Sequence, residues 1–70
     1  MTGPAPDIVD FGIALHHAQR ARGYRASAKE LRAHGDVFCA RAAEESARFH
    51  EGLVRAVAML AMATATQVPA

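Results

Sequence analysis

The sequence contains a single cysteine, three prolines and no tryptophan. One cysteine excludes the disulfide framework that stabilises many small secreted domains, and it is typical of a reducing compartment. The prolines lie at positions 4, 6 and 69, so the long segment between them lacks the residue that most strongly breaks a helix. Only 6% of the residues are aromatic, which leaves few large side chains to build a core.

Long apolar runs and strand patterns are also absent. The most apolar stretch, 53–65, is interrupted by Arg55 and is shorter than the roughly 20 residues that cross a membrane. The first residues carry no basic segment followed by an apolar one, so we expect no secretory signal and a cytoplasmic location. No alternation of β-branched and polar residues indicates a strand. The net charge of +1 argues against a generally basic nucleic-acid-binding protein.

Helix-forming residues fill the chain from position 8 to position 65. Fifteen of the seventeen alanines lie in this stretch together with arginine, glutamate, leucine and methionine, all of which favour helix. The order His34-Gly35-Asp36 is typical of a helix end, a left-handed glycine and the N-cap of a second helix. We therefore predict an all-α fold, an antiparallel two-helix hairpin with helices at about 8–33 and 37–65. It forms one small domain over 1–70, with 1–6 and 66–70 extended or frayed.

Gly23 offers an alternative turn, because Ser27 and Glu30 follow it with capping-box spacing. A turn there would produce three segments, the first a short helix at about 8–22. The apolar periodicity favours Gly35, since one stripe at helical spacing runs through Gly23 without a break. That stripe consists of Ile13, His17, Ala21, Tyr24, Ala28 and Leu31. A second stripe consists of Phe38, Ala42, Ser46, Phe49, Leu53, Val57 and Leu60.

The ends of both helices far from the turn are apolar on more sides than one neighbouring helix can cover. Leu53, Val57 and Leu60 are expected to face the first helix, which leaves Val54, Met59 and Met62 pointing elsewhere. We therefore predict a non-catalytic interaction module, a homodimeric four-helix bundle or a small accessory subunit of a larger protein complex. The predicted interface comprises Ile8, Phe11, Leu15, Phe49, Leu53, Val54, Val57, Met59, Leu60 and Met62.

A cluster of cations in the first helix supports an alternative function, a small regulator that binds nucleic acid. Its residues are Arg20, Arg22, Arg25, Lys29 and Arg32, and such a cluster can neutralise phosphates. The hairpin also brings Glu44, Glu45 and Glu51 beside it, so a pair such as Arg25 with Glu45 is expected between the helices. The sequence shows no helix-turn-helix or aromatic stacking platform, and nucleic acid is the less favoured partner.

The histidines suggest a third function, a metal-binding bundle. His16, His17, His50 and Glu51 would approach one another across the hairpin, although spacings such as H-x-x-x-H are absent. Cys39 lies in the first turn of the second helix, where the helix N-terminus can lower a thiol pKa; a buried structural cysteine is the more common case. No nucleophile motif or phosphate-binding glycine loop occurs, so we expect neither enzyme activity nor a cofactor.

Overall fold

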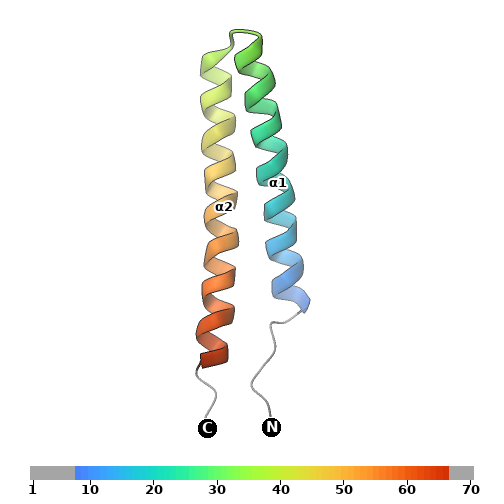
Figure 1. The fold of residues 1–70 in the computed structure, drawn as a ribbon, viewed down its shortest axis with the longest axis vertical. Coiled ribbons are helices and arrows are strands. Elements are labelled where there is room, and N and C mark those ends of the chain that lie inside the picture. The colour runs from blue at the N-terminus through green and yellow to red at the C-terminus, as the bar shows by residue number, and fades with distance from the viewer. Residues whose placement is uncertain (1–7, 67–70) are drawn as a thin grey trace.

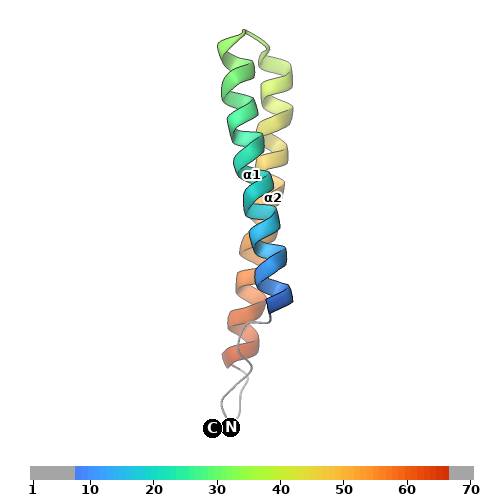
Figure 2. The ribbon, with the colours of Figure 1, turned by 90° about the vertical axis from the view of Figure 1, so that its right-hand side faces the viewer.

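Two long antiparallel helices form the whole fold. The computed structural model describes the backbone of residues 8–66 and the side chains of residues 10–64. Helix α1 spans Ile8–Ala33 and helix α2 spans Val37–Thr66, and no strand occurs within residues 8–66. Figures 1 and 2 show the helices side by side along their length, with the short turn at one end of the rod. We call the opposite end, where α1 begins and α2 ends, the open end.

The predicted hairpin and both of its helices are confirmed. Helix α1 has the predicted bounds, and α2 ends at Thr66, one residue beyond the predicted end. Thr66 was expected to be frayed and is instead the last helical residue, whereas 1–6 and 67–70 lie outside the described residues. Gly23 lies in the middle of α1, so the alternative of three segments is wrong.

The turn follows from three consecutive residues, His34, Gly35 and Asp36. Gly35 has a φ of +82°, the left-handed conformation that glycine adopts with little strain. The Gly35 N–H donates to the Arg32 carbonyl (3.0 Å) and the Asp36 N–H donates to the Leu31 carbonyl (2.9 Å), the Schellman pattern that ends a helix. Asp36 then caps α2, since its Oδ1 accepts a hydrogen bond from the Cys39 N–H at 3.0 Å.

Alanines form the contact between the helices. The buried apolar residues are Ala21 and Ala28 of α1 and Ala40 and Ala47 of α2. The two alanines of each helix are seven residues apart, the spacing that keeps one line of each helix facing its neighbour. Methyl groups allow two helices to approach closely, but they remove little apolar area from water. The hairpin therefore has a narrow core, and no large side chain of residues 10–64 is fully buried.

The stripe predicted for α1 faces α2, with Ile13 exposed at its edge. Ala21 and Ala28 are buried, and His17, Tyr24 and Leu31 are half-buried. Of the residues predicted to face α1 from α2, Leu53 and Val57 are half-buried, whereas Leu60 is exposed. The stripe to which they belong does not face α1 as a whole, because Phe38 and Phe49 are exposed as well. A helix turned so that these large side chains faced α1 could not bring its backbone close to Ala21 and Ala28. The row formed by Ala40 and Ala47 faces α1 instead, and it lies on the side of α2 opposite Phe38 and Phe49.

Candidate interaction surface

The predicted interface residues fall into two groups in the structure. Phe11, Leu15, Phe49, Met59, Leu60 and Met62 are exposed. Leu53, Val54 and Val57 are half-buried, and the side chain of Ile8 lies outside the described residues. Val54, expected to point away from α1, lines a groove together with α1 residues. Among the described side chains, three further large apolar residues are exposed that were not predicted as interface residues: Ile13, Val37 and Phe38.

The outer face of α2 carries an apolar row that one charged residue interrupts. Successive helix residues are about 100° apart, which places the row about 180° from Ala40 and Ala47. Phe38 is 84% exposed, Phe49 63% and Leu60 68%, and the small side chains between them are exposed as well. We define the outer face of α2 by six residues, namely Phe38, Ala42, Glu45, Phe49, Ala56 and Leu60. Glu45 is the one charged residue among them.

The corresponding outer face of α1 is of a different character. At the same spacing, the side of α1 turned away from α2 carries Gly12, Gln19, Gly23, Ala26 and Glu30. All five are exposed, and none is a large apolar residue. The hairpin therefore has one polar and one apolar outer face, and a partner that buries apolar surface would dock on α2.

An apolar groove lies between the helices near the open end. Its volume is about 300 Å³. Its lining residues come from both helices: Asp10, Phe11, Ala14, Val54, Val57, Ala58 and Ala61. Phe11 is exposed at its edge. Near the open end the alanine contact is thus incomplete, and apolar side chains of both helices remain accessible in the groove.

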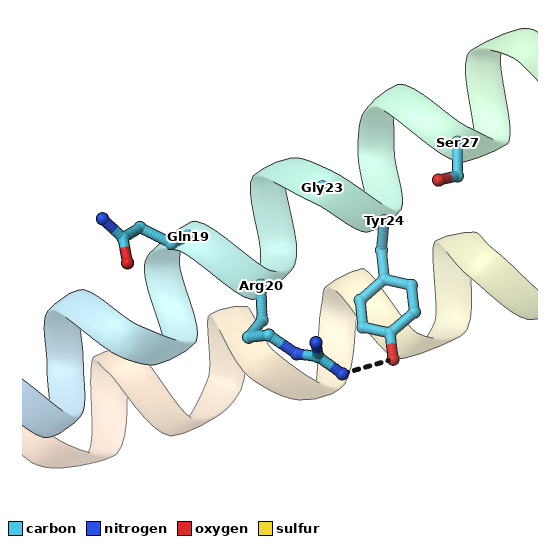
Figure 3. Close-up of a pocket in the computed structure, with 5 residues that line it drawn as sticks. All are labelled: Gln19, Arg20, Gly23, Tyr24 and Ser27. Atoms are coloured by element: carbon cyan, nitrogen blue, oxygen red, sulfur yellow. Dashed lines mark hydrogen bonds between the residues drawn. The ribbon is translucent and has the colours of Figure 1, made fainter.

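A second depression of about 300 Å³ lies on α1 alone. Figure 3 shows its lining residues, Gln19, Arg20, Gly23, Tyr24 and Ser27. An Arg20 Nη2 donates to the Tyr24 hydroxyl at 3.2 Å, and the Arg20 guanidinium carbon lies 5.4 Å from the centre of the Tyr24 ring. The depression exists because Gly23 has no side chain; it is a feature of one helix surface, with no second element to enclose a ligand.

The histidines meet as the hairpin geometry predicted. His17 Nδ1 and His50 Nδ1 lie 2.7 Å apart, so the Nδ1–H of one ring donates a hydrogen bond to the Nδ1 of the other. The His50 ring stacks on the rings of His17 and Tyr24, with centroids 4.9 and 5.6 Å apart. His16 contacts the edge of His17 at 5.1 Å. These rings join α1 to α2 on one side of the alanine contact.

The histidine cluster favours a neutral His50. Burial lowers the pKa of His50 below its usual value, and the positive charges of His17, Arg20 and His16 lower it further. Within the part of the chain that the structure describes, no group of three or more histidine, cysteine, aspartate or glutamate side chains could hold a metal ion. The metal site predicted from His16, His17, His50 and Glu51 is therefore not formed in one chain, because Glu51 binds an arginine instead.

Two ion pairs connect the helices on the other side of the alanine contact. Arg25 forms two hydrogen bonds to the Glu51 carboxylate, at 2.8 and 3.1 Å, and Arg32 forms two to Glu44, at 2.6 and 3.0 Å. The expected pair of Arg25 with Glu45 is wrong, because Glu45 lies on the outer face of α2. The arginines lower the pKa values of Glu44 and Glu51, which in turn raise those of Arg32 and Arg25.

Four of the five cations of the predicted nucleic-acid site lie on one side of α1, and Arg20 lies apart from them. Arg22 and Lys29 are exposed, and Arg25 and Arg32 are held by carboxylates. Arg20 lies beside Tyr24, on the histidine side of the alanine contact. A pattern that the sequence analysis missed lies on α2, where Arg41, Arg48 and Arg55 recur every seven residues. This regular spacing is the signal that could have revealed it.

Cys39 fits neither of the two interpretations offered for it. The thiol is exposed, so it is not a buried structural cysteine. Its pKa is raised, mainly by a hydrogen bond to Asp36 and by the charge of that carboxylate. The N-cap that begins α2 therefore opposes the effect of the helix N-terminus, and a low-pKa thiolate is not formed.

Comparison with known proteins adds no relative: no family model, no curated protein and no solved structure matches this chain. Among residues 8–66, neither helix is long and apolar enough to cross a membrane.

Proposed function

We propose that this protein is a non-catalytic assembly module that binds a second copy of itself through the outer face of α2. One observation carries the proposal: the largest apolar side chains of α2 lie on the side opposite the alanine contact. Phe38 and Phe49 are more exposed than is usual for phenylalanine, which is most often found in protein interiors. Burying each would gain about 1.5–3 kcal/mol.

The spacing of the outer face suits a second copy in antiparallel orientation. Phe38, Phe49 and Leu60 are separated by eleven residues each, so Phe49 lies at the midpoint of the row. A two-fold axis at Phe49 would place the Phe49 rings of two copies together and each Phe38 against the partner's Leu60. Ala42 would then meet the partner's Ala56, where two small side chains allow close approach. Such self-complementarity is what a two-fold interface requires.

This arrangement differs from a square four-helix bundle. In a square bundle each helix contacts two neighbours on adjoining sides, whereas the outer face of α2 is opposite its contact with α1. A second copy docked there gives a layer of four helices in the order α1, α2, α2, α1. The apolar groove at the open end would remain accessible. The exposed cysteine supports a reducing, cytoplasmic setting for the assembly.

Sedimentation velocity over a range of protein concentrations tests the proposal. We expect the mass to rise from 7.4 kDa to twice that value as the concentration increases. Phe49→Asp should leave a monomer at every concentration, because it places two charges at the centre of the interface. Ala26→Asp is the matched control, since it adds the same charge at an exposed position on the outer face of α1.

Two results would overturn the proposal. A wild-type chain that stays at 7.4 kDa up to millimolar concentration has no second copy as its partner. Equal loss of association in Phe49→Asp and Ala26→Asp would mean that added charge, and not the outer face of α2, decides the outcome. Circular dichroism of both variants verifies that each remains helical.

A further inference from the structure

Seven of the eight cations of the chain lie on one long side of the hairpin. We call this side the basic face. Its members are Arg22, Arg25, Lys29 and Arg32 of α1 and Arg41, Arg48 and Arg55 of α2. The carboxylates on the same side are Glu44 and Glu51, so seven positive and two negative side chains leave a formal charge of +5. The whole chain carries only +1, and the eighth cation, Arg20, lies on the histidine side.

The contacts between the helices establish this grouping. The two ion pairs, Arg25 with Glu51 and Arg32 with Glu44, place the α1 cations next to the α2 carboxylates. Arg48 follows Glu44 by one helical turn, and its positive charge helps to lower the pKa of both carboxylates. Arg55 follows Glu51 in the same way. The seven-residue spacing then places Arg41 in line with Arg48 and Arg55.

Five of these cations are available to a ligand. All five are exposed: Arg22, Lys29, Arg41, Arg48 and Arg55. None of them takes part in the two ion pairs among the described residues, which involve Arg25 and Arg32. Seven residues of helix advance about 10.5 Å, and packed helices lie about 8–10 Å apart. The free cations thus form two parallel rows, and the α2 row extends over about 21 Å.

We infer that the basic face binds the phosphate backbone of double-stranded nucleic acid without reading its sequence. Two rows of cations over about 21 Å match a duplex, which carries one negative charge per roughly 1.7 Å of its axis. Protein–nucleic acid interfaces are polar and strongly positive, whereas a protein partner would require an apolar centre. By helical spacing, no large apolar side chain occupies this face between Arg41 and Arg55.

The same face lacks the groups that other nucleic-acid interactions need. Single strands are bound by stacking on aromatic rings placed among the cations. By helical spacing, no aromatic ring lies on this face between Arg22 and Arg32 of α1 or between Arg41 and Arg55 of α2, and Tyr24 stacks on His50 on the histidine side. Adenine is read in the major groove by asparagine or glutamine, and the one glutamine of the described residues, Gln19, lies on the outer face of α1. A membrane-binding helix combines cations and apolar anchors on one amphipathic surface. Here the phenylalanines of α2 belong to the adjoining outer face, and the exposed Val37, Met59 and Met62 lie beyond the two ends of the row from Arg41 to Arg55.

Fluorescence anisotropy with a labelled duplex of about 20 base pairs tests the inference. We expect binding to duplexes of unrelated sequence with equal affinity. The affinity should fall with salt at a slope of about −4.5 in a plot of log K against log salt, since five cations each contribute about −0.9. A triple variant, Arg41→Gln with Arg48→Gln and Arg55→Gln, should reduce the slope by about 3 and lower the affinity at least tenfold.

A second triple variant provides the matched control. Arg20→Gln with Gln19→Glu and Ser27→Glu changes the net charge by the same three units, but at exposed positions away from the basic face. It should retain a slope near that of the wild type. Equal loss in both triple variants would overturn the inference, because net charge alone would then explain binding.

Phosphate groups also occur on lipid surfaces, so binding to anionic vesicles is measured beside binding to the duplex. The vesicles contain a mole fraction of about one third phosphatidylserine. Binding to vesicles without binding to the duplex would also overturn the inference. The inference does not require self-association: Phe49→Asp alters the outer face of α2 and should leave the salt slope per hairpin unchanged. Loss of dimerisation and loss of duplex binding are therefore measured by different variants.

Discussion

Replacing Ala47 by leucine should destabilise the hairpin strongly. Ala47 is 0% exposed and lies where α2 contacts α1, together with Ala21, Ala28 and Ala40. A leucine side chain has no room there unless the helices separate along their length. Overpacking of a filled site costs about 1–3 kcal/mol. For a domain of this size each kcal/mol corresponds to about 4–8 °C in melting temperature, so we expect a decrease of at least about 4 °C.

The control for this experiment is Ala26→Leu. Ala26 lies on the exposed outer face of α1, and alanine and leucine are both strong helix formers. Its melting temperature should remain close to that of the wild type when both variants are followed by circular dichroism at one protein concentration. If Ala47→Leu melted at or above the wild-type temperature, the alanine contact would not hold the helices together. Our account of the core would then fail.

Two further predictions concern the turn and the histidine cluster. Gly35→Ala should lower the free energy of unfolding by about 1 kcal/mol, because alanine resists the left-handed conformation. Gly23→Ala, which fills open space inside a helix, should raise the free energy of unfolding by about 1 kcal/mol. Urea unfolding measures this free energy for both variants. A Gly35→Ala chain more stable than the Gly23→Ala chain would contradict the turn geometry. Because the pKa of His50 is lowered in the folded state, the stability that its neutral form contributes is complete above about pH 6.5 and is lost as the pH falls through the folded pKa. The melting temperature should therefore fall from about pH 7.5 to about pH 5 less steeply in His50→Gln than in the wild type, and equal slopes would refute the role of His50.

The candidate surfaces were only partly predictable from the sequence. The exposure of Phe11, Met59 and Met62 follows from the fact that these apolar side chains cannot all share one face of a helix. The α1 cations of the basic face were predicted, but its α2 row was missed, because only the rotation of α2 against α1 places Arg41, Arg48 and Arg55 on the same side of the hairpin as those cations. The pairing of Arg25 with Glu51 depends on the same rotation.

The sequence by itself determined the helices and the turn. Local chemistry is sufficient for both: residues 8–66 contain no proline, Gly35 accepts a positive φ, and Asp36 caps the helix that follows. The tertiary structure decided which side of α2 faces α1. Two stripes of helical period were available on α2, one of large residues and one of alanines, and periodicity cannot rank them. The alanine stripe packs because close approach also brings Arg25, Arg32 and His17 within reach of partners on α2, and the phenylalanines are consequently left on the outside.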